Sequence, residues 1–195
     1  GTVYYVRAYA TNSAGTSYGN ELRFSTSIAD IEGNIYKTVL IGTQLWMAEN
    51  LKTTHLNNNV PIPNVTDNVE WSSTTTPAYC WMYNEISYKN IYGALYNWHT
   101  VHTGNLCPAG WHVPSDEEYM TMEAYLGMTP SQVEEWEWRG TNQGTQLKST
   151  TGWNLGGNGT NSSGFTALPG GYRFAIDGSF NNVNDITYWW TSSEI

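Results

Sequence analysis

The sequence predicts an α+β protein rich in loops, because three patterns follow one another along its 195 residues. A run near the N-terminus alternates in side-chain character with period two, which is typical of strands. Residues 115–127 carry the start and stop signals of a helix. Most of the chain after residue 140 is divided by glycines into short segments. A chain of this length can bury the core of one domain, or of one domain and part of a second.

The composition limits the kinds of partner. Only 13% of the residues are charged, whereas about 25% is usual for globular chains, and aromatic residues make up 14%. So much aromatic area favours a folded core over disorder. The net charge of −9, with eight Lys and Arg residues scattered along the chain, argues against a nucleic-acid partner. No run approaches the roughly 18 apolar residues of a membrane helix, so we expect no membrane insertion.

Residues 1–27 predict two strands joined by a turn of Gly, Asn and Ser residues. The run VYYVRAYA alternates with period two, and ELRFS is its expected partner. This segment is similar to the last two strands of a fibronectin type III-like or immunoglobulin-like domain of bacterial surface proteins. A lone hairpin leaves backbone unpaired on both edges. We therefore expect further strands to cover it, supplied by upstream chain or by a neighbouring molecule.

Residues 28–195 mix short strands, helices and loops. We expect strands in IYKTVLIG and QLWMAENL, at 35–42 and 44–51. A helix is expected at 91–102, because four residues there follow helical spacing: Tyr92, Leu95, Tyr96 and His99. In the later turn GFTALPGGYR, we expect Arg173 to pair with a nearby carboxylate.

A second helix, at 116–126, has the clearer signals. Ser115 and Glu118 form a capping box, and Gly127 supplies a left-handed stop. We expect a buried stripe made of Tyr119, Met122, Tyr125 and Leu126. The following segment, 129–140, has Pro130 at a suitable first helical position, although it could also be irregular.

Six segments occur in order through the second part of the chain: IYKTVLIGTQLWMAENLKT, TPAYCW, YGALYNWHTV, LCPAGWHVPSDEEY, GFTALPGGYR and YWWTSSE. Together they resemble the Fibrobacter succinogenes major paralogous domain, found in secreted and surface proteins of Bacteroidetes-like bacteria. The resemblance implies a C-type-lectin-like fold, similar also to formylglycine-generating enzymes, with two helices, short antiparallel strands and long loops. It also implies that the family domain continues beyond YWWTSSE into strands that contain another cysteine, so its C-terminal part is expected to be missing here.

Cys80 and Cys107 could form one disulfide or remain two thiols. The resemblance implies that the later family cysteine is the usual partner of the one in CPAGWHVP, which makes a bridge between Cys80 and Cys107 the less favoured alternative. Three N-x-[ST] triplets, at Asn64, Asn158 and Asn161, are candidate glycosylation sites in a suitable secretory host.

The densest group of reactive side chains lies in CPAGWHVPSDEEY, where the candidate zinc ligands are Cys107, His112, Asp116 and Glu117. Zinc sites need four convergent ligands, and carboxylates at the start of a helix are favourable there without a metal. The pattern therefore favours a structural role and no metal site. Calcium stays a candidate cofactor through oxygen ligands such as Asn184 and Asp185.

Catalysis has little support in the sequence. Ser115, the one serine close to a histidine along the chain, is used as a helix cap. The carboxylates that could serve glycoside hydrolysis lie on helix-like, solvated faces: Asp116, Glu117, Glu134, Glu135 and Glu137. We predict that the protein is not an enzyme.

Aromatic rings are the remaining candidates for a binding surface. Trp71, Trp136 and Trp138 lie in polar segments, where flat rings can stack on sugar faces. By contrast, Trp46, Trp98 and Trp111 lie among aliphatic neighbours and are expected in the core.

These observations predict a non-catalytic, extracellular or cell-surface module with a structural or adhesive task. Its expected partners are other copies of the protein, neighbouring surface proteins and glycans. Neighbouring copies could complete each other's sheets and so build a filament. A lectin-like domain, with or without calcium, is the alternative, and an enzyme related in fold to formylglycine-generating enzymes is less favoured.

Overall fold

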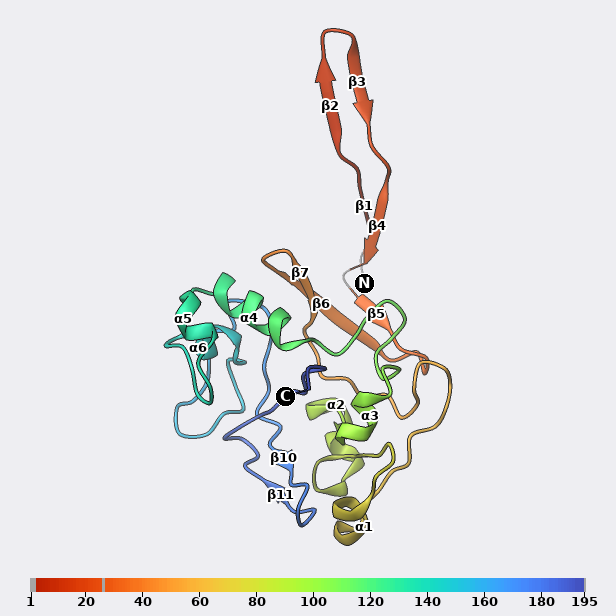
Figure 1. The fold of residues 1–195 in the computed structure, drawn as a ribbon, viewed down its shortest axis with the longest axis vertical. Helices are drawn as coiled ribbons and strands as arrows, with labels where there is room; N and C mark the ends of the chain where they lie inside the picture. The colour runs from red at the N-terminus through yellow and green to blue at the C-terminus, as the bar shows by residue number, and fades with distance from the viewer. Residues whose placement is uncertain (1–2, 26, 195) are drawn as a thin grey trace.

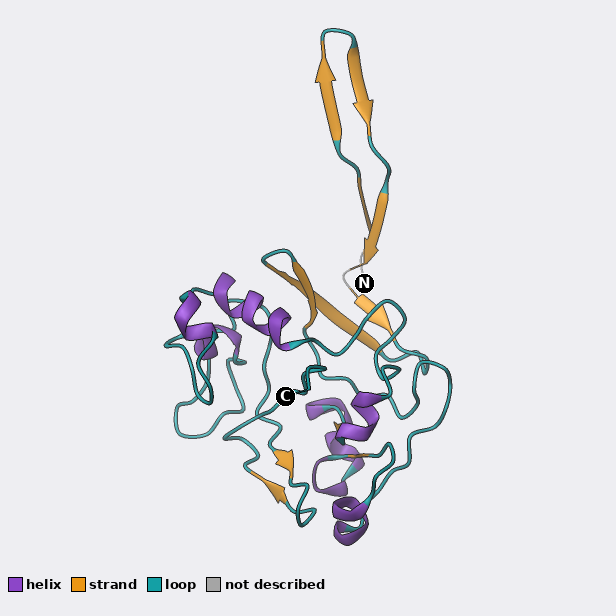
Figure 2. Cartoon of the chain, viewed as in Figure 1, coloured by secondary structure: helices purple, strands orange, loops and turns teal. Residues whose placement is uncertain are grey.

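The computed structural model describes residues 3–25 and 27–194. Residues 27–194 form a rounded body, from which the N-terminal hairpin projects (Figure 1). The body has the predicted α+β, loop-rich architecture: short helices and short antiparallel strand pairs are joined by long loops (Figure 2). No helix in the described part of the chain is long and apolar enough to cross a membrane.

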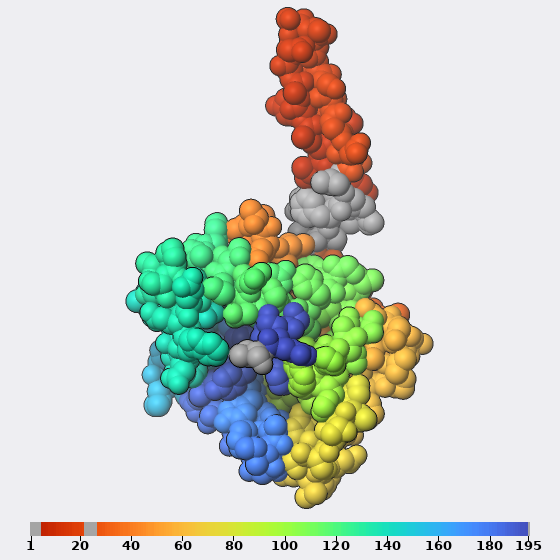
Figure 3. All heavy atoms as spheres, in the orientation of Figure 1, coloured from red at the N-terminus to blue at the C-terminus, as the bar shows by residue number. Residues whose placement is uncertain are grey.

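The hairpin contains two antiparallel strand pairs, β1 (Val3–Val6) with β4 (Leu22–Ser25) and β2 (Tyr9–Asn12) with β3 (Gly15–Tyr18). It stands clear of the body, and residues 5–21 are all exposed (Figure 3). The rings of Tyr9 and Tyr18 lie opposite each other with centroids 6.1 Å apart, and the guanidinium of Arg7 lies 4.2 Å from the Tyr18 centroid. No other described strand pairs with these four. The predicted hairpin is confirmed, with each strand interrupted once.

The largest sheet of the body has three antiparallel strands in the order β5 (Ser27–Ala29), β6 (Ile35–Ile41) and β7 (Gln44–Met47). Gly42, with φ 61°, makes the tight turn between β6 and β7. Both strands expected in this region are confirmed, although the second ends at Met47. Because β7 is the outermost strand, one of its edges has no neighbouring strand among the described residues.

The helix expected at 91–102 is wrong as a single element. The segment forms α2 (Lys89–Tyr92), β9 (Leu95–Tyr96) and α3 (Trp98–His102), and β9 pairs with β8 (Tyr79–Cys80). Gly93 ends α2 with φ 74°, and the amide of Ala94 then donates to the carbonyl of Leu51 at 2.9 Å. Asn97 begins α3 by accepting the Thr100 amide at 3.0 Å. Tertiary pairing therefore interrupts a pattern that has helical spacing.

Helix α4 (Asp116–Tyr125) is confirmed together with its signals. The Ser115 hydroxyl accepts the Glu118 amide, the Glu118 carboxylate accepts the Ser115 amide, and Gly127 follows with φ 107°. Of the predicted stripe, Met122 is buried, while Tyr119 and Leu126 are half-buried. Tyr125 was wrongly placed in the core: it is 67% exposed. Its ring covers the β6–β7 turn at Gly42 from the solvent side.

The remaining elements are short. They are α1 (Asn68–Ser73), 3₁₀ turns at Met82–Asn84 and Ile86–Tyr88, α5 (Pro130–Val133), α6 (Gln143–Leu147), and the pair β10 (Tyr172–Arg173) with β11 (Phe180–Asn181). Pro130 is the first residue of α5, as predicted, and Thr129 with Gln132 forms a second capping box. The sequence analysis missed α1 and α6.

Three small clusters make up the core of the body. One surrounds Trp81 and Leu106, a second contains Trp46 and Phe165 beneath β7 and α4, and the third contains Trp71. The prediction of Trp46 as a core residue is confirmed. Trp98 and Trp111 are half-buried, and Trp98 packs against the first cluster.

Arg173 joins the third cluster to the loops around it. This side chain is only 8% exposed, and its guanidinium lies 4.5 Å from the Trp71 ring centroid and 4.8 Å from that of Phe180. It donates five hydrogen bonds: to the carbonyls of Val65, Thr66, Asp67 and Gly178 and to the side-chain oxygen of Asn68. The predicted carboxylate partner is therefore wrong, because loop carbonyls occupy the guanidinium.

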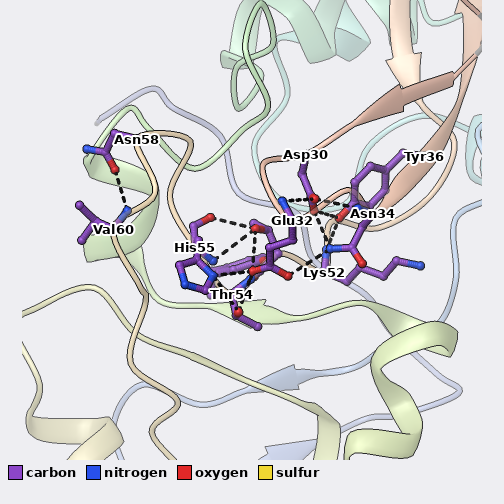
Figure 4. A network of polar contacts seen from close by, with 11 residues as sticks. Asp30, Glu32, Asn34, Tyr36, Lys52, Thr54, His55, Asn58 and Val60 are labelled. Atoms are coloured by element: carbon purple, nitrogen blue, oxygen red, sulfur yellow. Dashed lines mark hydrogen bonds and ion pairs between the residues drawn. The ribbon is translucent and has the colours of Figure 1, made fainter.

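A second polar network fixes the loop that leads into β6 (Figure 4). The Glu32 carboxylate accepts the Thr54 amide at 2.5 Å, the Thr54 hydroxyl at 2.6 Å and a bond from His55 Nδ1 at 2.8 Å. Nearby, the Tyr36 hydroxyl donates to Asp30 at 2.6 Å. Burial on its own would raise the pKa of Glu32, but the hydrogen bonds from Thr54 and His55 outweigh it and lower this pKa to about 2.

We expect the substitution Arg173→Met to lower the free energy of unfolding by about 3 to 5 kcal/mol, because it leaves buried carbonyls without a donor. Arg173→Lys should recover only part of this loss, since an ammonium lacks the planar fork of donors. Urea-induced unfolding measures both. Lys37→Met, at an exposed site of β6, is the control and should change stability by less than about 0.5 kcal/mol. A loss below about 1 kcal/mol for Arg173→Met would contradict the assigned role.

Glu32 should also make stability depend on pH. Its pKa is lower in the folded state than the ordinary value of 4.5, so its contribution is complete above pH 4.5 and is lost as the pH falls towards 2. Glu32→Gln should lower stability at pH 7 and reduce the further loss between pH 5 and pH 2.5. Urea titrations across this range measure the effect, with Glu70→Gln, at an exposed carboxylate, as control. Equal pH dependence in the two variants would refute this prediction.

Candidate functional site

A cavity with a volume of about 830 Å³ lies beside β7. All four residues of β7 line it, together with residues 94–96, 110–114 and 187–190. Aromatic rings form much of the wall, among them Tyr96, Trp111, Tyr119, Phe165, Trp189 and Trp190. A largely apolar cavity of about 300 to 1,000 Å³ is typical of a binding site.

Hydrogen bonds hold the C-terminal part of this wall in place. The indole of Trp190 donates to the Tyr96 carbonyl at 2.8 Å, and the indole of Trp189 donates to the Asn50 side chain at 3.3 Å. Beyond them, the Ser192 amide donates to the Pro114 carbonyl at 2.8 Å. The wall therefore draws on three segments that are distant in sequence and joined by specific bonds.

The charged groups at the cavity have structural partners. Both oxygens of Glu118 lie 2.9 Å from His112 Nε2, and one of them accepts the Ser115 amide at 2.8 Å. The bond from the Ser115 amide is the main cause of a lowered pKa for Glu118, and His112 adds to it while burial opposes it. Glu118 is thus an ionised capping residue.

The two cysteines are free thiols, so the bridge that the sequence left open between Cys80 and Cys107 is absent. Cys80 is fully buried in the third core cluster, and Cys107 lies on the cavity wall. Burial raises the pKa of each thiol to about 11. Both are therefore protonated at neutral pH, whereas reactive or metal-binding cysteines need the thiolate.

The candidate metal ligands do not converge. Within residues 3–25 and 27–194, no three His, Cys, Asp or Glu side chains are grouped so that they could hold a metal ion. His112, from the predicted zinc set, is engaged by Glu118. Asn184, proposed as a calcium ligand, accepts the Tyr92 hydroxyl at 2.8 Å through its side-chain oxygen.

The profile of the Fibrobacter succinogenes major domain matches residues 39–195 of the chain. The chain belongs to this family. The identification made from the six sequence segments is therefore confirmed. No curated protein and no solved structure matches the chain. The likeness to C-type lectins and the origin of the hairpin in a β-sandwich consequently stay predictions, as does the domain boundary after residue 27.

The tryptophans predicted to bind ligands separate into two groups on the Fibrobacter succinogenes major domain. Trp71 does not lie on the surface, because it is 7% exposed and stacks with Arg173 in the core, but it is one of the residues that line the cavity. It occupies the one buried position of the amphipathic helix α1, which the sequence analysis missed. Trp136 and Trp138 are 77% and 79% exposed and are not part of the cavity wall. They stay candidates for a separate contact surface.

The candidate glycosylation sites also differ in access. Asn64 and Asn158 are exposed. Asn161 is half-buried in the left-handed region with φ 51°, and its amide nitrogen donates to the Thr166 hydroxyl at 3.0 Å. Of the three, Asn161 is therefore the least suited to carry a glycan.

The sequence analysis missed the residues that build the cavity. Trp189 and Trp190 belong to the family segment YWWTSSE and are also rings that could stack on a sugar, and two adjacent tryptophans beside Tyr188 are a signal of dense aromatic packing. The contribution of β7 had no signal of its own, since a free strand edge depends on which strands pair.

Proposed function

We propose that this chain is a non-catalytic structural or adhesive module of a bacterial surface or secreted protein, and that its hairpin binds further protein copies by strand addition. The observation that carries the proposal is the hairpin itself. It projects from the body, no other described strand pairs with its edges, and Tyr5, Tyr9 and Tyr18 are 62%, 71% and 56% exposed.

An isolated two-stranded hairpin is marginally stable in water, and unpaired strand edges recruit further strands. The hydrogen bonds within the hairpin show which of its amides are free to bond with an added strand. The Gly19 amide donates to the Ala8 carbonyl at 2.8 Å, and successive amides of a strand point to opposite sides. By this alternation, the amides of Thr11 and Thr16 point outward on the two edges of the hairpin.

Other properties support a non-catalytic module of this kind. Both thiols are protonated, and Ser115 and Glu118 are used in the cap of α4. The surface is poor in charge, with 13% charged residues overall, and is rich in exposed rings. Such a surface suits contact with proteins or glycans at an extracellular location.

The double substitution Thr11→Pro with Thr16→Pro should weaken association at least about tenfold, or about 1.4 kcal/mol. Proline removes the outward amide of each edge without removing an inward one, so the hairpin keeps its own ladder. Sedimentation velocity over a concentration series, together with electron microscopy for fibres, measures association.

The matched control is Thr11→Val with Thr16→Val. It removes the 2.8 Å bond between the two hydroxyls but keeps both outward amides, so it should associate like the wild type. A wild-type chain that is monomeric at all concentrations, with no fibres, would refute strand addition by the hairpin.

Carbohydrate binding is the second candidate function. It is favoured by the two exposed indoles of Trp136 and Trp138, which are two residues apart and surrounded by Glu134, Glu135 and Glu137. Flat rings of this kind stack on the apolar faces of sugars.

If the domain is lectin-like, Trp136→Ala with Trp138→Ala should lower the affinity by about tenfold or more for the glycans that the wild type binds on an array probed with and without calcium. The melting temperature should be unchanged because both rings lie outside the core. Leu155→Ala, at a fully exposed apolar residue, is the control. The absence of any glycan that binds the wild type, with or without calcium, rules out this alternative.

A further inference from the structure

The free edge of β7 is directed by its pairing with β6. The Ala48 amide, just after β7, donates to the Lys37 carbonyl of β6 at 2.9 Å. Since successive amides alternate, those of Leu45 and Met47 point away from β6. No strand in the described part of the chain lies on that side of β7, and both residues line the aromatic cavity. The molecule therefore combines a free strand edge with an apolar hollow beside it.

This combination matches the way in which extended segments bind to sheets. In strand addition, main-chain hydrogen bonds along an edge supply affinity, and alternate side chains enter adjacent pockets. The cavity of about 830 Å³ beside β7 offers such a pocket, lined by the rings of Tyr119 and Phe165 among others. An occupant needs unpaired backbone and aromatic or aliphatic side chains at alternate positions.

The hairpin of the same chain meets these requirements. No other strand in the described ranges pairs with its outer edges, and the rings of Tyr9 and Tyr18 form one exposed pair with the guanidinium of Arg7 beside it. The charges are complementary as well: the hairpin carries Arg7 and Arg23 against one carboxylate, Glu21, whereas the whole chain has a net charge of −9. The charged groups at the cavity are the carboxylates of Glu49 and Glu118, of which Glu118 is paired with His112, and the guanidinium of Arg173, which is bonded to loop carbonyls.

We propose that the hairpin of one copy adds to the free edge of β7 in a second copy, with its tyrosine pair placed against the aromatic cavity. This inference rests on the proposed function, because it names the surface that receives the hairpin. The tip of the hairpin lies far from its own body, so the contact joins two molecules (Figure 1). Donor and acceptor are different surfaces, which makes the contact head-to-tail and allows it to propagate into a ring or a filament.

The test uses one variant that is blocked as a donor and one that is blocked as an acceptor. The donor-blocked chain carries Thr11→Pro and Thr16→Pro. The acceptor-blocked chain carries Leu45→Pro, which removes an outward amide of β7 but no amide that faces β6. Leu45→Val keeps that amide and is the matched control. Circular dichroism and the melting temperature establish that each variant is folded.

The expected result comes from native mass spectrometry and sedimentation velocity on single and mixed samples. The wild type and Leu45→Val should form a series of oligomers, and each blocked variant alone should be monomeric. An equimolar mixture of the two blocked variants should give a one-to-one dimer and nothing larger, because the mixture retains one working donor and one working acceptor. The dissociation constant of that dimer should lie within about tenfold of the wild-type contact.

Three results overturn the inference, and they can be distinguished from one another. If folded Leu45→Pro assembles like the wild type while the donor-blocked variant is monomeric, the hairpin binds another surface, and the proposed function stands without this acceptor. If the wild type is monomeric at all concentrations, the proposed function and this inference are both overturned. That conclusion holds even if the cavity of the monomer binds an added oligosaccharide. A mixture that stays monomeric also overturns the inference.

Should Leu45→Pro fail to fold, Thr187→Trp blocks the acceptor by another route. Thr187 lines the cavity and is half-buried outside β7, so an indole at this position fills the hollow and leaves the β6–β7 ladder intact. The same single and mixed samples are then measured with this variant. Assembly of Thr187→Trp at the wild-type level contradicts the inference.

Discussion

The buried guanidinium of Arg173 is the contact on which the irregular half of the body depends. It holds the carbonyls of residues 65–67, which precede α1, against the turn at Gly178, more than a hundred positions away in sequence. Neither segment has a long strand ladder to satisfy these carbonyls, and a buried carbonyl without a donor is costly. The rings of Trp71 and Phe180 lie beside the cation, so that its charge is balanced by carbonyl dipoles and aromatic faces.

The same principle operates through the rest of the body. Glu32 gathers the amide and hydroxyl of Thr54, and Thr100 exchanges bonds with both the amide and the carbonyl of Ala78. In these loops, side chains therefore form the hydrogen bonds to backbone amides and carbonyls that neighbouring strands form in a regular sheet. The consequence is a core divided into three clusters, between which a cavity can persist. An aromatic wall pinned by indole hydrogen bonds, such as that of Trp190, keeps its shape without being filled.

Features with local causes could be predicted from the sequence, and features set by distant contacts could not. The capping box at Ser115 fixes the start of α4 within one turn, and the strand expected at 35–42 corresponds to β6. By contrast, Gly93 breaks an apparent helix because the Ala94 amide bonds to the carbonyl of Leu51, which is distant in sequence. Trp71 lies among polar neighbours in sequence, and its burial depends on Arg173, whose carbonyl partners are invisible in any pattern. The family itself was recognisable because six motifs recur in order.

The candidate site belongs to the features that depend on contacts between segments distant in sequence. Its strand edge is that of β7, the outermost strand of the sheet among the described residues, and its apolar character comes from segments brought together by indole and backbone bonds. The hairpin has the opposite property, since its strands and rings are exposed and no other described strand covers them. Both surfaces have edge amides and carbonyls with which no described strand pairs. The hairpin also presents aromatic rings, and the body has a hollow beside β7 that can receive them. Because the two surfaces are distinct, satisfying one in a given copy leaves the other free, and association is therefore expected to continue from copy to copy until a ring closes or the ends are capped.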